Sequence, residues 1–81
     1  MSSAFDLLYK LPRDPARERR LTDDVAAHGG RLNHADETAI EHISNTICLT
    51  YEFDDLSTAE RCADALREHG EHIEGPYEYG G

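Results

Sequence analysis

Hydrophobic and polar side chains alternate along residues 46–53, the most regular stretch of the chain. Ile47, Leu49, Tyr51 and Phe53 occupy every second position, with Cys48, a threonine or a glutamate between them. Alternation with period two, together with β-branched and aromatic residues, is typical of a strand that is buried on one face. The sequence therefore predicts a strand over residues 46–53, which Asp54 and Asp55 end.

After this strand the spacing of the apolar residues changes to that of a helical face. Apolar side chains recur at i, i+3, i+4 and i+7, which places them on one stripe. These are Ala59, Cys62, Ala63 and Leu66. Ser57 and Glu60 fit a capping box, in which the serine hydroxyl accepts from the Glu60 amide and the glutamate reaches back. Gly70 marks the expected end of this helix.

The segments on either side complete a repeating order of strands and helices. Residues 71–79 are expected to be extended. Phe5, Leu7, Tyr9 and Leu11 alternate with more polar residues and predict a first strand ending at Pro12. A second helix is predicted over residues 15–28. Its N-cap would be Asp14, its N1 residue Pro15, and its stop Gly29-Gly30.

Residues 31–45 fit two different structures. Alternation through Thr38, Ile40 and His42 permits a strand that turns at Ser44-Asn45. The same stretch also fits a helical face beginning at Ala35. We favour the strand, because it forms a hairpin with residues 46–53. No internal repeat is detected, and the chain is expected to be one domain over residues 1–81.

The predicted order is β-α-β-β-α-β, which corresponds to an α+β, ferredoxin-like fold. This fold has a four-stranded antiparallel sheet with two helices on one face. The last strand would lie at an edge, where Pro76 is tolerated, with Ile73, Gly75, Tyr77 and Tyr79 sharing a face. One core is expected to contain Ile47, Leu49, Tyr51, Phe53, Ala59, Cys62, Ala63, Leu66 and Ile73.

The chain is strongly acidic. Its 81 residues include 17 Asp and Glu against eight Lys and Arg, a formal net charge of −9, and seven of the eight basic residues are arginine. This excess disfavours direct binding to nucleic acid or anionic membrane and favours basic protein surfaces. Selection for solubility or for high salt would also produce an acidic composition. The acidity alone therefore does not decide between partner binding and these two explanations.

Other features of the sequence argue against secretion and membrane insertion. The two cysteines form no disulfide framework and no CxxC motif. The N-terminal residues do not show the basic region followed by an apolar run that is typical of a secretory signal peptide. No apolar run is long enough to span a bilayer. We expect a cytoplasmic protein.

No pattern in the sequence indicates a catalytic or cofactor site. His69 and His72 with Cys62 lack the spacing of a zinc site, and Ser57 and the Asp54-Asp55 pair are explained by the predicted cap and turn. No glycine loop that could cradle phosphate is present. We expect no enzyme activity, no cofactor and no metal.

Acidic residues form the remaining candidate site. Glu60, Asp64 and Glu68 recur at i, i+4 and i+8, which aligns like charges along one face of the helix that ends before Gly70. Such an arrangement costs a few tenths of a kcal/mol per pair, yet it would suit a basic groove on a partner.

Two resemblances bear on function. About a quarter of the chain is similar to the F-D-D-x-x-x-A…A-x-x-L-x-x-x-G-x-x-I pattern of small ferredoxin-like regulatory modules, among them the regulators of ribonuclease E activity. The matching residues are Phe53, Asp54, Asp55, Ala59, Ala63, Leu66, Gly70 and Ile73. In size and acidity, and in having no recognisable active site, the chain also resembles small phage-encoded inhibitors, including anti-CRISPR proteins. These share no motif, so this resemblance assigns no residue.

The sequence therefore predicts a small acidic inhibitor or regulator that binds a protein with a basic surface. It would block a nucleic-acid-binding machine by acting as a nucleic-acid mimic. The alternative is a regulatory module, either monomeric or homodimeric, that binds through its open sheet face. The predicted partner-binding residues are Asp54, Asp55, Glu60, Asp64, Glu68, Glu71, Glu74, Tyr77, Glu78 and Tyr79.

Overall fold

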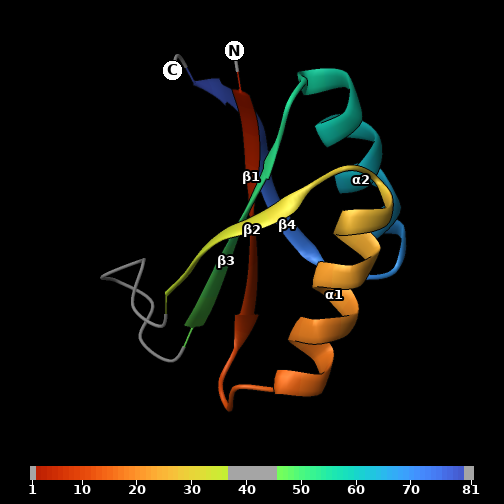
Figure 1. The fold of residues 1–81 in the computed structure, drawn as a ribbon. Helices are drawn as coiled ribbons and strands as arrows, with labels where there is room; N and C mark the ends of the chain where they lie inside the picture. Colours follow the sequence, from red (N-terminus) through yellow and green to blue (C-terminus); the bar gives the residue numbers. More distant parts are fainter. Residues whose placement is uncertain (1, 37–45, 80–81) are drawn as a thin grey trace.

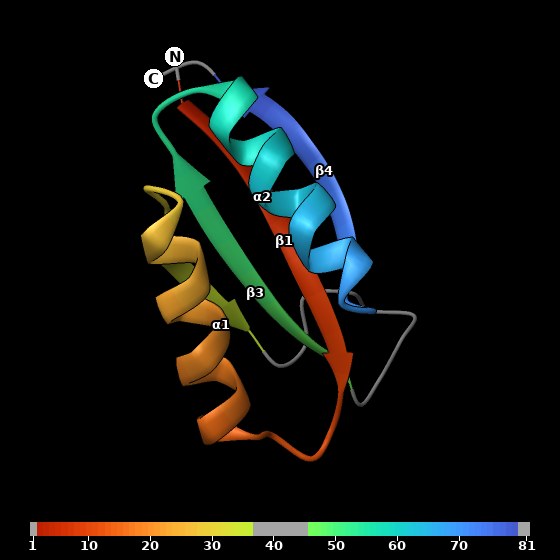
Figure 2. The same ribbon diagram turned by 90° about the vertical axis from the view of Figure 1, so that its right-hand side faces the viewer.

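Four strands and two helices make up the fold in a computed structural model that describes residues 2–36 and 46–79. Their order is β1 (Ser2–Lys10), α1 (Pro15–Ala27), β2 (Arg31–Asp36), β3 (Thr46–Phe53), α2 (Leu56–Glu68) and β4 (His72–Tyr79). The strands form one antiparallel sheet in the order β2-β3-β1-β4. Both helices lie on the same face of this sheet (Figures 1 and 2). The predicted α+β, ferredoxin-like arrangement is confirmed.

The core lies between the helices and the two central strands. Phe5 on β1 lies 5.3 Å from Phe53 and 5.9 Å from Tyr51 between ring centroids, and all three side chains are fully buried. The apolar stripe of α2 packs onto the same cluster, which contains all nine residues predicted to form it. The alternating pattern of β3 and the helical pattern of α2 therefore identify their buried faces correctly.

The N-terminal cap of α2 differs from the prediction. Asp55 is the N-cap, and its carboxylate accepts a hydrogen bond of 2.9 Å from the amide of Thr58. The helix begins at Leu56, so Ser57 lies within its first turn and the expected capping box of Ser57 and Glu60 is wrong. Asp55 follows the strand directly and lies two residues before Ser57, so its carboxylate reaches the orphan amides of the first turn.

The α1 helix begins as predicted and ends one residue earlier than expected. The Asp14 carboxylate accepts from the amide of Arg17 at 3.0 Å, and Pro15 is the first helical residue. At the other end, Gly29 has a φ of +87°, and the amide of Gly30 donates to the Val25 carbonyl at 2.9 Å. This is the hydrogen bond of a Schellman motif, which closes the helix.

The region of residues 31–45 contains a strand, as predicted, but this strand precedes the alternating residues on which the prediction rested. β2 covers Arg31–Asp36, and the backbone of Ala35 pairs with Leu49 of β3, which excludes a helix starting at Ala35. The alternation expected at Thr38, Ile40 and His42 and the turn at Ser44-Asn45 lie outside the described residues.

A β-bulge divides β4 into two parts. Asp6 of β1 pairs with Glu74 and Ala4 pairs with Tyr77, so two β4 residues lie opposite Phe5. The extra residue reverses the facing of the strand from this point onward. Ile73 therefore faces the helices while Tyr77 faces the open side, and the prediction that they share a face is wrong.

In the two described segments, neither α1 nor α2 is long and apolar enough to cross a membrane.

Candidate functional site

Three carboxylates line the exposed face of α2, and we call them the α2 acidic ridge: Glu60, Asp64 and Glu68. All three are exposed. Asp64 lies 3.6 Å from Arg67 in an i, i+3 ion pair. Glu60 and Glu68 form no ion pair with any other described residue. The structure therefore brings these three predicted residues together, and two of them are unneutralised.

The ridge is held on a well-anchored helix. The opposite side of α2 is buried in the core, and hydrogen bonds from Thr58 hold the pKa of the Asp55 carboxyl below its usual value. Near the other end, the Arg67 guanidinium donates to the carbonyl oxygens of Ile73 at 3.1 Å and Gly75 at 2.7 Å. α2 is thus tied both to the core and to strand β4.

Three of the other predicted carboxylates already have partners within the fold. Asp55 is occupied as the N-cap of α2. Glu71 forms an ion pair of 2.6 Å with Arg17 of α1, and only 14% of its side chain is exposed. Asp54 lies 3.4 Å from Arg31 of β2 but remains 89% exposed. Asp55 and Glu71 therefore have structural roles and are poor candidates for binding a partner.

The predicted residues of β4 lie on two faces. Strand pairing places Glu74, Tyr77 and Tyr79 on the open face of the sheet, whereas Glu78, paired with Ser3, lies on the helix-bearing side. The α2 acidic ridge lies on α2, away from the open face (Figure 2). The ten predicted residues therefore do not form one continuous surface.

The open sheet face is polar around Tyr77, whose side chain is 43% exposed. Its hydroxyl lies 3.5 Å from both carboxylate oxygens of Asp6, and Asp6 also accepts from the Thr50 hydroxyl at 2.7 Å. Burial, followed by the charge of Asp6, raises the pKa of Tyr77. Leu8 and Cys48, which also lie on this face, are only 9% and 6% exposed. This face therefore exposes one aromatic residue, and its Leu8 and Cys48 are covered.

Charge is unevenly divided along the chain. Residues 46–79 contain nine Asp and Glu and two Arg, a net charge of −7, whereas residues 10–20 contain five Lys and Arg and two acidic residues, a net charge of +3. The acidic part includes α2 and β4, and the basic part is the start of α1 with the turn before it. The acidity is therefore concentrated in the C-terminal part of the chain.

A network of polar contacts at the start of α1 was not identified from the sequence. Tyr9 donates to Glu18 and accepts from the Asp14 amide at 3.1 Å, and Arg13 forms an ion pair of 2.8 Å with Glu18. The bond from Arg13 lowers the pKa of Glu18, and burial raises the pKa of Tyr9. Arg17 lies over the Tyr9 ring, with 4.8 Å between its Cζ and the ring centroid. These contacts fix α1 on β1.

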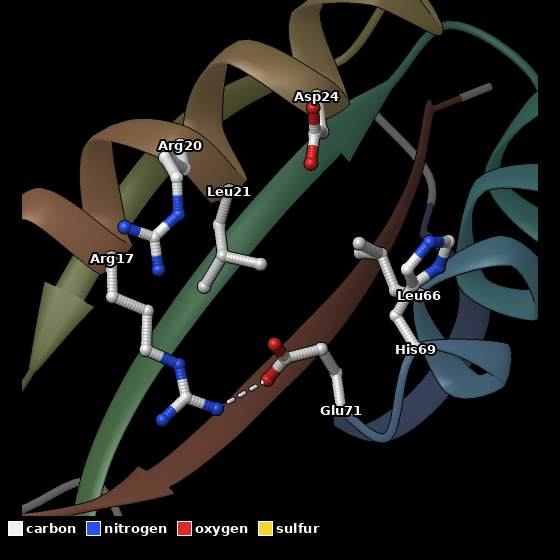
Figure 3. Close-up of a pocket in the computed structure, with 7 residues that line it drawn as sticks. All are labelled: Arg17, Arg20, Leu21, Asp24, Leu66, His69 and Glu71. Carbon is white, nitrogen blue, oxygen red and sulfur yellow. Dashed lines mark hydrogen bonds and ion pairs between the residues drawn. The ribbon is translucent and has the colours of Figure 1, made fainter.

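A groove of about 270 Å³ lies between α1 and the C-terminal end of α2 (Figure 3). Its lining residues come from α1, from α2 and from the turn before β4. They are Arg17, Arg20, Leu21, Asp24, Leu66, His69 and Glu71. The sequence offered no motif for this groove, since its residues converge only through the packing of the two helices.

The two described segments contain no group of three or more His, Cys, Asp or Glu side chains placed to hold a metal ion. His69 and His72 lie on different elements: His69 is the C-cap of α2 and His72 is the first residue of β4. Cys62, the cysteine nearest to these histidines in the sequence, is fully buried in the core.

Comparison with known proteins provides no further assignment. No family model matches the chain, and neither the curated proteins nor the solved structures yielded a match.

Proposed function

We propose that this protein is a small acidic regulator or inhibitor that binds the basic surface of another protein through the α2 acidic ridge. The observation that carries this proposal is the exposure of Glu60 and Glu68 without ion-pair partners among the described residues. The fold keeps three like charges in line on α2, although their mutual repulsion costs a few tenths of a kcal/mol per pair. A basic partner would relieve this repulsion.

The expected target is a machine that handles nucleic acid. Arginine and lysine side chains that hold phosphates would also bind carboxylates, so the ridge would compete with nucleic acid for the same groove. The cap at Asp55 and the anchor at Arg67 favour such competition, because the helix is already ordered before binding. Anti-CRISPR-like inhibitors and regulators of ribonuclease E activity, the two groups that the sequence resembles, both act on machines of this kind.

A second candidate function rests on Tyr77. Its 43% exposure on the open sheet face favours a regulatory module that binds a partner, or a second copy of this chain, through that face. The acidity would then serve solubility or salt adaptation. Sedimentation equilibrium of the wild type and of a Tyr77→Ala, Tyr79→Ala double variant tests this alternative. A dimer that the double variant abolishes would support it.

Affinity capture with charge-reversed bait tests the main proposal. The ridge variant carries Glu60→Lys, Asp64→Lys and Glu68→Lys. A matched control with the same change in net charge carries Asp23→Lys, Asp24→Lys and Glu74→Lys, at exposed positions outside the ridge. We expect the wild type and the control to capture the same nucleic-acid-binding protein at low salt, and the ridge variant to lose it.

The captured protein must then release nucleic acid when the wild type is added, as measured by a mobility-shift assay. If the ridge variant captures the same partner as tightly as the wild type, the α2 acidic ridge is only solvated surface and the proposal is wrong.

A further inference from the structure

The groove between α1 and α2 contains opposite charges that the fold leaves unpaired. Arg20 and Asp24 lie one helical turn apart on α1, yet they form no ion pair with each other. Neither side chain has a hydrogen-bond partner among the described residues. By contrast, Arg17 at one end of the groove is neutralised by Glu71 at 2.6 Å. The groove therefore offers one free guanidinium and one free carboxylate.

The ring of His69 adds a free acceptor on the opposite wall. Its Nδ1 lies 2.8 Å from the Ala65 carbonyl oxygen, which can only accept, so Nδ1 carries the proton. In the neutral ring this leaves Nε2 as an unprotonated acceptor. Figure 3 shows His69 and Leu66 on the α2 side of the groove and Arg20, Leu21 and Asp24 on the α1 side.

The floor of the groove is apolar. Leu21 and Leu66 lie at its base, and each is only 5% exposed. The volume of about 270 Å³ lies just below the range of about 300–1,000 Å³ that is usual for drug-sized ligands. A ligand for this groove would thus be small, partly apolar, and charged at both ends.

We propose that the groove between α1 and α2 binds a small zwitterion of the α-amino acid class that carries an aliphatic side chain. Its carboxylate would pair with Arg20. Its ammonium group would donate to Asp24 and to Nε2 of His69, and its side chain would lie over Leu21 and Leu66. Neither the ion pair of Arg17 nor the α2 acidic ridge takes part, so this site is independent of the proposed protein-binding function.

Titration of the intact protein with L-leucine, followed through the methyl resonances of Leu21 and Leu66, tests the proposal. N-acetyl-leucine and leucinamide serve as probes, because each lacks one of the two charges. We expect saturable shifts with a Kd of about 1 mM for leucine, and binding that is weaker by about tenfold or more for each blocked probe. If both blocked probes bind as well as leucine, or if leucine causes no saturable shift, the proposal is overturned.

Neighbouring residues on α1 provide matched control variants. Arg20→Ala and Asp24→Asn should each weaken leucine binding by about tenfold, because each removes one charge contact. Arg19→Ala and Asp23→Asn make the same chemical changes at adjacent positions that do not line the groove, and should leave the Kd within about twofold of the wild type. Equal effects of the two pairs would contradict the assignment, and the blocked probes decide the matter if any variant fails to fold.

Discussion

Arg17 and Glu71 are 54 residues apart in the sequence, and they join α1 to the turn before β4 through an ion pair of 2.6 Å. Arg17 also lies over the ring of Tyr9, so one guanidinium connects three elements. This contact explains why Glu71, an acidic residue in a strongly acidic segment, is not available to a partner.

Removing the charge of Glu71 should weaken the fold. We expect Glu71→Gln to lower the free energy of unfolding by about 0.5–1.5 kcal/mol, since the pair is only partly exposed to solvent. Glu74→Gln, on an exposed β4 position, is the control and should have little effect. Urea denaturation measures both changes, and equal stability of the two variants would show that the Arg17 contact contributes nothing.

The cap at Asp55 makes a second prediction possible. Asp55→Ala should destabilise the protein more than Ser57→Ala, because the Asp55 carboxylate accepts from the amide of Thr58. The pKa of Asp55 is lowered in the fold, so its contribution is complete above the ordinary value of 3.8 and is lost as the pH falls through the folded-state pKa.

Acid unfolding curves of the two variants check this second prediction. The wild type should lose the advantage over Asp55→Ala as the pH is lowered, while the difference from Ser57→Ala stays small throughout. If Ser57→Ala lost more stability than Asp55→Ala, Ser57 would be the N-cap and the assignment of Asp55 would be wrong.

Gly30 should be intolerant of a side chain although its φ is ordinary. A Cβ at this position would lie 2.5 Å from atoms of both Phe53 and Val25, which are fully buried. Overpacking of this kind typically costs about 1–3 kcal/mol, so Gly30→Ala should lower the unfolding free energy by that amount. Thermal and urea denaturation measure it, and a neutral substitution would mean that Phe53 moves freely.

Cys62 should be inert in the folded protein. It is fully buried, and burial, followed by the charge of Asp24, raises the pKa of its thiol to about 11. A rise of about two pKa units leaves roughly a hundredfold less thiolate at pH 8. Iodoacetamide labelling read by mass spectrometry should therefore modify Cys62 only after denaturant is added. Rapid labelling of the native protein at this position would contradict the burial.

Local patterns allowed much of the fold to be predicted. The period of β3 depends only on residues 46–53, and the stripe of α2 on residues 59–66, so both faces follow from the sequence alone. The bulge in β4 could not be predicted, because it depends on how Gly75 and Pro76 pair with β1. Once Ile73 faces the core, this bulge decides which side Tyr77 occupies.

The two helices have matching caps, of which only the N-cap Asp55 was not predicted from the sequence. Asp14 and Asp55 are both N-caps of 13-residue helices. Each C-cap histidine is followed by a glycine with a φ near +90°. Each helix joins two strands of one strand–helix–strand unit, so the two sets of caps occupy equivalent places in the order of elements.

The candidate site was predicted only in part, because local patterns can be read from the sequence and contacts between distant segments cannot. The α2 acidic ridge follows from helical periodicity, so it was found in the sequence. The pairing of Glu71 with Arg17 depends on packing between distant segments, as does the groove that contains Arg20 and Asp24.

Salt should separate the two candidate functions once the captured partner is purified. In the ridge mechanism, the wild-type Kd should rise steeply with salt, because screening weakens each carboxylate contact. A neutral ridge variant should bind about tenfold more weakly at low salt and depend less on salt, since three rim charges contribute roughly 0.5 kcal/mol each. It carries Glu60→Gln, Asp64→Asn and Glu68→Gln.

A neutral control variant has the same net charge as the neutral ridge variant, which separates local contacts from overall charge. It carries Asp23→Asn, Asp24→Asn and Glu74→Gln. If the ridge contacts the partner, this control should keep most of the wild-type affinity and salt dependence. If the open face binds instead, the Tyr77→Ala, Tyr79→Ala variant should lose affinity while the neutral ridge variant keeps it. Isothermal titration calorimetry at several salt concentrations measures all four proteins, and equal salt dependence of the ridge and control variants would refute a localised acidic site.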